Sequence, residues 1–282
     1  VVAQRSQESA VSEPSLQDIA LTDCRNSLFQ RLIENELRHG RTDFIGTLNR
    51  QGRMHPDVAA FSCNAFYRRE EIRPVPLPHQ LETSLGYDAP SLDATDDLLK
   101  QHRVLFFPSQ FCREPGISDK VNADEARIVA SLVLRIARFY GTKFDAQKTI
   151  GIIVPYRNQI AMIRQAIERL TGPDDCRHDG CPDGLRPSQT TARQLKDIAI
   201  DTVERYQGSQ RDVIIYSFTI QQRYQLDFLA ANTIEEDGHL IDRKLNVALT
   251  RARRQLLLTG NPDILSHNPL FRELMEYVTK VK

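Results

Sequence analysis

The chain has 282 residues with 37 basic and 37 acidic side chains, and 40% of its residues are hydrophobic. This composition is typical of a folded globular protein rather than a disordered one, and at about 100 to 200 residues per domain it allows one large domain or two small ones. No apolar run approaches the roughly 18 residues that span a bilayer, and the first five residues lack a secretory pattern, so no membrane contact is expected. A net charge of zero excludes a uniformly basic surface but leaves room for a local one.

Five scattered cysteines argue against a disulfide framework and favour a reducing compartment, so we expect a cytoplasmic protein. Cys176, His178 and Cys181 form the nearest approach to a metal site. A zinc site usually has four ligands in two pairs, whereas this cluster offers three and is flanked by Pro, Asp and Gly. The sequence therefore predicts a solvent loop here and no bound metal.

Five short apolar segments without polar alternation are predicted to be strands buried on both faces: Arg103–Phe107, Ile150–Val154, Ile198–Asp201, Val213–Phe218 and Gln255–Thr259. Apolar residues at helical spacing lie between them, over 128–136 and 160–170. Strands that alternate with helices indicate an α/β fold, with a mainly parallel sheet and helices on both faces.

The flanking regions differ from this pattern. Residues 1–44 are expected to form a helical linker segment, with a helix over Leu28–Leu37 that ends at His39-Gly40, and residues 45–282 are expected to form the α/β domain. Within that domain, Pro74 to Asp97 holds four Pro, four Asp and no Lys or Arg. We therefore predict an irregular insertion over residues 74–102.

A phosphate-binding loop of the form Gly-x-x-x-x-Gly-Lys-Ser/Thr does not occur in the 282 residues. Asp124-Glu125-Ala126 imitates a magnesium-binding box, but it opens a predicted helix instead of ending an apolar strand. Asn122, three residues before Glu125, predicts an N-cap with reciprocal capping. The chain by itself is therefore not expected to hydrolyse a nucleotide.

Three polar segments carry candidate chemistry. Arg53 precedes a predicted helix start at His55-Pro56, and residues 201–212 form a polar stretch between two apolar strands. Residues 243–254 hold five basic and no acidic side chains, and we expect them to form a helix with a positive edge. Each segment alone is equally explained by a surface residue, a loop with a tight turn at Gly208, or a solvated helix face.

Together, however, the segments resemble motifs of the superfamily 1B helicases. Leu48 to Val58 is similar to the family's Gln-Tyr-Arg-Met-His-Pro motif, and Asp201 to Asp212 resembles its motif V. Leu245 to Arg253 matches the Leu-Asn-Val-Ala-Leu-Thr-Arg-Ala-Arg of motif VI at every position, and Ile152 to Gln159 resembles a Pro-Tyr-Arg-x-Gln segment. The motifs keep the family's order and cover about residues 46–261.

The resemblance implies a RecA-like, P-loop-NTPase-type domain, and more specifically the second of the two motor domains of such a helicase. In the family, the first domain carries the phosphate loop and a Gly-Asp-x-x-Gln-Leu-Pro segment, and we expect this chain to begin just after that segment. The implied activity is ATP hydrolysis with Mg²⁺ ligated mainly by the first domain, coupled to stepping along single-stranded DNA or RNA, usually 5′ to 3′. The implied partners are that strand and the first RecA-like domain of the same polypeptide, in a monomer.

By position in the family motifs, Arg251 is the arginine finger and Arg53 a second γ-phosphate contact, and both count as catalytic and nucleotide-binding residues. Guanidinium groups stabilise the charge that spreads over the departing phosphoryl oxygens. The resemblance also implies nucleotide-side roles for Gln207, Gly208 and Gln210.

Thr202, Tyr156 and Gln159 are the residues that the resemblance places along the nucleic acid. Thr202, Gln207 and Gly208 together are expected to couple the nucleotide cleft to the strand.

Two positions depart from the family pattern. Gly52 replaces the usual Tyr, so that side chain cannot stack on an adenine, and Gln210 replaces a Glu, which weakens an expected ribose contact. A non-catalytic nucleic-acid-binding or adaptor module with the same fold remains an alternative. A free-standing NTPase is opposed by the absence of the phosphate loop.

Overall fold

The computed structural model describes residues 11–19, 21, 23, 27–112, 118–172, 184–231, 233–236 and 238–280. The chain divides into two compact units, Val1–Asn49 and Arg50–Lys282. The first contains α1 (Pro14–Asp18) and α2 (Leu28–Arg38). Ser27 begins α2 because its Oγ accepts a hydrogen bond from the Gln30 amide at 3.1 Å, and the predicted helix is confirmed.

A five-stranded parallel sheet forms the centre of the second unit, in the order β3-β9-β6-β4-β5. The strands are β3 (Val104–Pro108), β4 (Ile150–Val154), β5 (Ala199–Thr202), β6 (Arg211–Ser217) and β9 (Ala252–Gly260). Each overlaps one of the five predicted segments. Two short pairs lie outside this sheet: β1 (Arg50–Gln51) with β2 (Arg73–Pro74), and β7 (Thr233–Glu236) with β8 (His239–Asp242).

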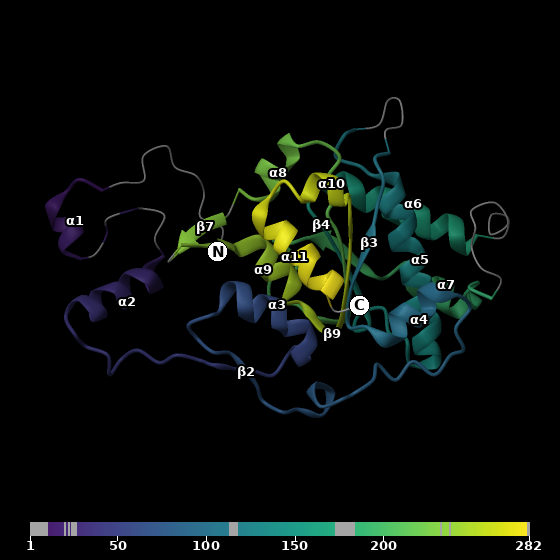
Figure 1. Cartoon of the computed structure of the whole chain (residues 1–282), viewed down its shortest axis with the longest axis horizontal. Helices are drawn as coiled ribbons and strands as arrows, with labels where there is room; N and C mark the ends of the chain where they lie inside the picture. Colours follow the sequence, from purple (N-terminus) through teal and green to yellow (C-terminus); the bar gives the residue numbers. More distant parts are fainter. Residues whose placement is uncertain are drawn as a thin grey trace. The chain divides into compact units, whose positions relative to one another are not determined.

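Helices cover both faces of the sheet, as expected (Figure 1). One face packs against α4 (Ala94–Gln101), α5 (Ala123–Tyr140), α6 (Arg157–Thr171) and α7 (Gln189–Leu195), with the short η2 (Gly141–Lys143) after α5. The other packs against α3 (Pro56–Phe66), α8 (Tyr224–Leu229), α9 (Arg243–Leu249), α10 (Pro262–Leu265) and α11 (Pro269–Lys280). Successive strand residues alternate between the two cores: Ile152 lies in the first and Ile153 in the second. In the described part of the chain, no helix has the length and apolarity needed to cross a bilayer.

The prediction of an irregular insertion over residues 74–102 is wrong for the last third of that range. After a single turn, η1 (Pro78–Gln80), the chain forms α4, which begins where the Asp93 side chain accepts a hydrogen bond from the Asp96 amide. Asp93 and Asp96 also accept hydrogen bonds from Arg135 of α5, at 2.6 to 2.7 Å. The acidic composition that suggested a solvated loop therefore reflects a buried ion-pair network.

The prediction of a single helix over residues 243–254 is also wrong. α9 ends at Leu249, Thr250 Oγ1 donates to the Asn246 carbonyl at 2.8 Å, and β9 begins at Ala252. The strand prevails because its apolar half pairs with β3 on one side and β6 on the other. Arg251 consequently lies in the turn between helix and strand.

The reciprocal cap expected at α5 forms in one direction only. Asn122 Oδ1 accepts from the Glu125 amide at 3.0 Å, as predicted. The Glu125 carboxylate, however, accepts from Ser217 Oγ at 2.6 Å and from the Thr219 amide at 2.8 Å. It therefore ties the start of α5 to the end of β6 instead of closing the cap.

Candidate functional site

Arg53 and Arg251 come together at the amino ends of β6 and β9. Arg53 lies in the loop between β1 and α3, and its Nε donates to Gln210 Oε1 at 3.1 Å while its Nη1 donates to the Thr250 carbonyl at 3.0 Å. The His55 amide fastens the same loop to the start of β9, donating to the Arg253 carbonyl at 2.7 Å. Residues about 200 positions apart in sequence thus share one site.

Arg251 is held by its own turn. Its Nε donates to the Val247 carbonyl at 2.9 Å and its Nη2 to Thr250 Oγ1 at 3.1 Å. Burial lowers the pKa of this guanidinium, and the proximity of Arg53 lowers it further. Among the described residues, no carboxylate lies within ion-pair distance of either arginine. Two half-buried cations without a counter-charge make a site that favours an anion such as a phosphate.

The insertion supplies the support for the Arg53 loop. Gln51 Oε1 accepts from the Arg53 and Met54 amides at 3.0 and 2.7 Å. Buried Gln80 in turn donates from Nε2 to the Gln51 and Met54 carbonyls at 3.0 and 2.8 Å. Sequence reasoning missed Gln80, because it lies 29 residues from Gln51 and carries no local signal.

Gly52 packs against the insertion as well. A Cβ atom at this position would lie 3.1 Å from Leu77 Cδ1, which is closer than ordinary van der Waals contact. A tyrosine here, as the helicase pattern has it, would require Leu77 to move. The glycine and the insertion are therefore mutually compatible.

The polar segment after β5 joins opposite ends of the sheet. Thr202 ends β5 at the carboxyl edge, and Gln207 and Gly208 lie exposed in a turn where Gly208 has φ +88°. Gln210 then lies directly before β6, next to Arg53. The structure therefore brings Gln210 to the two arginines but leaves Thr202 at the other edge.

Tyr156 and Gln159 lie at the carboxyl edge as well, and both are buried. Gln159 has no exposed surface: its Oε1 accepts from the Asn122 amide and its Nε2 donates to the Asn122 carbonyl, each at 2.9 Å. Tyr156 is 9% exposed and stacks on Phe228, with ring centroids 5.1 Å apart. The expected direct contact of Gln159 with a strand is thus not available in this structure, since its amide serves to join α5 and α6.

The positive edge expected over 243–254 is largely neutralised. Three of its five basic side chains form ion pairs: Lys244 with Glu204 at 2.9 Å, Arg253 with Asp212 at 3.1 Å and Arg254 with Glu82 at 2.7 Å. Arg251 differs from these three because the described chain offers it no carboxylate. The exposed Arg243 also has no carboxylate partner in the described chain, and Arg251 differs from it because the Arg251 side chain is half-buried and is held by the Val247 carbonyl.

Cys176, His178 and Cys181 lie outside the described residues. Within the described ranges, no group of three His, Cys, Asp or Glu side chains is arranged to hold a metal ion.

Residues 24–263 match the sequence profile of the AAA domain. The regulator of nonsense transcripts 1 homolog of Arabidopsis thaliana is 28% identical over 253 residues, which cover 89% of this chain and 17% of that protein. The DNA polymerase alpha-associated DNA helicase A of Saccharomyces cerevisiae is 27% identical over 251 residues, covering 85% and 30%. An uncharacterized ATP-dependent helicase of Methanocaldococcus jannaschii is 23% identical over 274 residues, covering 92% and 32%.

The chain therefore spans less than a third of the length of each of these relatives. The profile match covers most of its residues, and the parallel sheet with helices on both faces agrees with a P-loop-type α/β domain. The chain belongs to the AAA domain family and is a superfamily 1B helicase-like domain.

Proposed function

We propose that this chain is the C-terminal motor domain of an ATP-dependent helicase that acts on single-stranded DNA or RNA. In this proposal, an N-terminal RecA-like domain of the same polypeptide supplies the phosphate loop and most Mg²⁺ ligands. Arg251 and Arg53 contact the γ-phosphate across the cleft between the two domains. The 282-residue chain alone is inactive as an ATPase.

The observation that carries the proposal is the convergence of Arg251 and Arg53 without a carboxylate among the described residues. In phosphoryl transfer, negative charge spreads over the oxygens of the departing group, and a guanidinium supplied from a second domain stabilises that charge. A cation neutralised by an Asp or Glu would be far less effective. Arg253, which Asp212 engages at 3.1 Å, is such a cation and lies two residues from Arg251.

The adaptor alternative requires the same fold without a functional finger. It is less favoured, because backbone carbonyls hold both arginine side chains in place. Thr250 accepts from Arg53 through its carbonyl, and Val247 accepts from Arg251. A domain that had lost the motor would have no need of an arginine finger, so the complete match of residues 245–253 to motif VI also favours the helicase.

The test is Arg251→Ala in a polypeptide that joins this chain to its phosphate-loop domain. We expect nucleic-acid-stimulated ATP hydrolysis to fall by about 10³ or more, with single-strand affinity nearly unchanged. Arg253→Ala is the matched control, since it removes a paired arginine from the same segment and should retain most of the activity.

Two results would contradict the proposal. One is ATPase activity in Arg251→Ala within a few-fold of the wild type. The other is ATP hydrolysis by the 282-residue chain alone, which would place a complete phosphate site within it.

A further inference from the structure

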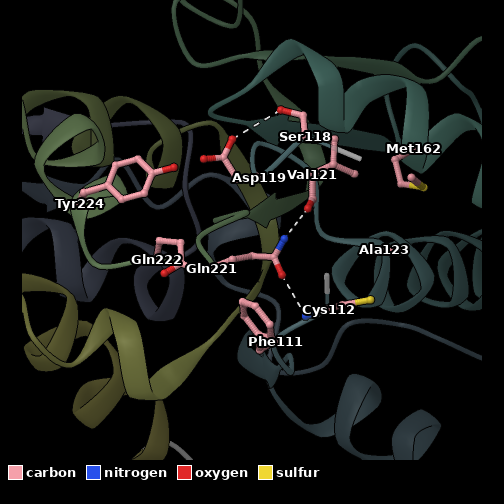
Figure 2. A pocket seen from close by; sticks show the side chains of 10 residues that line it. All are labelled: Phe111, Cys112, Ser118, Asp119, Val121, Ala123, Met162, Gln221, Gln222 and Tyr224. Atoms are coloured by element: carbon pink, nitrogen blue, oxygen red, sulfur yellow. Dashed lines mark hydrogen bonds between the residues drawn. The ribbon is translucent and has the colours of Figure 1, made fainter. Parts of the chain in front are cut away.

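A pocket of about 300 Å³ opens at the carboxyl ends of β3 and β6 (Figure 2). Its walls include Phe111 after β3, Met162 of α6 and Tyr224 of α8, and its polar groups include Asp119, Gln221 and Gln222. None of these six residues belongs to a helicase motif identified from the sequence. The pocket lies at the opposite edge of the sheet from Arg53 and Arg251.

Buried Gln221 makes the floor of this pocket rigid. Its Oε1 accepts from the Cys112 amide at 2.8 Å, and its Nε2 donates to the Val121 carbonyl, as the dashed lines in Figure 2 show. The side chain thereby joins the segment after β3 to the segment before α5. A pocket with such a bridged floor exists before any ligand binds, which reduces the entropic cost of binding.

Two aromatic rings at the pocket are exposed. Phe111 is 52% exposed and Tyr224 is 59% exposed, so both keep apolar ring faces in water. Because every nucleic-acid base has a flat π-face, exposed aromatic rings are the usual stacking platforms for unpaired bases. The flexible thioether of Met162 can adapt to a third side of such a ligand.

The polar groups of the pocket suit the edge of a base better than a phosphate. The side-chain amide of Gln222 has no hydrogen-bond partner in the described chain, although its backbone N–H donates to Gln225 Oε1 at 2.9 Å. The Asp119 carboxylate accepts only a long hydrogen bond of 3.5 Å from Ser118 Oγ. An amide and a carboxylate can recognise the amino and carbonyl groups of a base. The same carboxylate repels a phosphate.

Cationic side chains that could contact a phosphate lie beside this pocket. A second hollow of about 350 Å³ shares Cys112, Ala123 and Met162 with the first and is lined by Arg127 and Arg169. Arg127 belongs to α5 and pairs with Asp124 at 3.0 Å, while Arg169 of α6 has no carboxylate partner among the described residues. A stacking pocket beside Arg169, with the paired Arg127 next to it, matches the base and the phosphate of a nucleotide unit.

We infer that this pocket binds one unpaired base of the single-stranded nucleic acid, with the backbone of that nucleotide passing toward Arg127 and Arg169. The inference rests on the proposed function, which brings a strand to this domain. Ligands of open α/β sheets bind outside the carboxyl ends of the strands, and Thr202 lies at that same edge. A strand that reaches Thr202 can therefore continue to the pocket along one edge of the sheet.

The test measures binding of a short labelled single strand to the 282-residue chain by fluorescence anisotropy. Tyr224→Ala and Phe111→Ala should each weaken binding about fivefold or more, the loss expected for one stacked base, whereas Tyr224→Phe should bind like the wild type. A strand of equal length with abasic sites should bind the wild type more weakly and should lose little further affinity in Tyr224→Ala. Phe44→Ala, which removes an exposed ring outside the pocket, is the matched control.

The outcomes separate the two proposals. If the wild type binds the strand but both alanine variants bind equally well, the pocket assignment is overturned and the strand partner stands. If the wild type binds no single strand, the strand partner of the proposed function fails and the pocket assignment fails with it.

The half-buried thiol of Cys112 gives an independent readout that needs no substitution. We expect a saturating single strand to slow the alkylation of Cys112, while half-buried Cys63, outside the pocket, reacts at an unchanged rate. Mass spectrometry of the two cysteine-containing peptides measures both rates. Equal protection by a mononucleotide such as AMP at the same concentration would overturn the strand assignment in favour of a free nucleotide. Lack of protection by a bound strand would overturn the pocket assignment itself.

Discussion

The two edges of the central sheet carry similar polar residues but use them differently. At the amino edge, Arg53 donates to the Gln210 side chain and to the Thr250 carbonyl, and Arg251 donates to the Val247 carbonyl. Neither arginine has a carboxylate partner among the described residues. At the carboxyl edge, Glu125 and Gln159 are fully buried and their side chains are engaged by neighbouring strands and helices. The first arrangement lacks a counter-charge, whereas in the second the hydrogen bonds of the polar side chains are made.

This difference distinguishes the arginine cluster, which we propose as a ligand site, from the Glu125–Gln159 network, which is structural. A buried polar group is retained only when its hydrogen bonds are made, so the carboxyl-edge network should contribute to folding. A group that awaits a ligand should be nearly dispensable for folding, because its best partner is absent. Substitutions at the two edges should therefore separate stability from activity.

The largest effect on stability is expected from the charge of Glu125. Burial raises its pKa from 4.5 to about 7, although Ser217 and the Thr219 amide partly offset that effect. The pKa of Glu125 is higher in the folded state than in the unfolded state. Its protonated carboxyl group therefore contributes stability that is fully present below about pH 4.5 and is lost as the pH rises through 7. A shift of this size corresponds to about 3 kcal/mol in the free energy of unfolding.

Urea denaturation of wild type and Glu125→Gln across about pH 4 to 8 measures this effect, because the amide does not titrate. The difference between the two proteins should shift in favour of the variant as the pH rises. Parallel pH profiles of the two proteins would show that Glu125 titrates normally and that its carboxylate is not desolvated.

Gln159→Leu should destabilise the chain by about 2 kcal/mol, since it leaves the buried Asn122 amide without a partner. Gln165→Leu on the same helix replaces an exposed amide and should change the free energy of unfolding by less than about 0.5 kcal/mol. Equal effects of the two substitutions would remove the basis for treating Gln159 as a structural residue. Reduced strand affinity in a stably folded Gln159→Leu variant would instead restore its expected binding role.

The sequence predicted the sheet well, because strands buried on both faces leave uninterrupted apolar runs such as Ile150–Val154. It predicted less of the polar network, because a side chain looks the same whether it contacts a ligand or a distant backbone group. Gln159 joins Asn122 across 37 residues, and Gln80 supports Gln51 across 29. The α9–β9 junction was missed because helical spacing and a strand run overlap at residues 250–254.

Gly208→Ala should destabilise by about 1 kcal/mol, because alanine tolerates φ +88° poorly. An added Cβ would meet no atom within 4 Å, so the cost comes from the backbone and not from a clash. Gly46→Ala is the control, since that glycine also has open space but no positive φ. Thermal or urea denaturation measures both, and a stabilised Gly208→Ala would mean that this turn adopts another conformation in solution.

The smallest effect is expected from Gln210→Glu, which places a carboxylate against the Arg53 guanidinium at the amino edge. If the edge lacks a counter-charge, the new ion pair should stabilise the fold by up to about 0.5 kcal/mol at low ionic strength, and about 1 M salt should remove the gain. Gln207→Glu adds the same charge at an exposed position that contacts neither arginine in the described chain, and it should bring no such gain. Identical salt dependence of the two variants would indicate that solvent already screens Arg53. In that case the arginines at the amino edge would be able to bind an anion because they are exposed to solvent, and not because they lack a counter-charge.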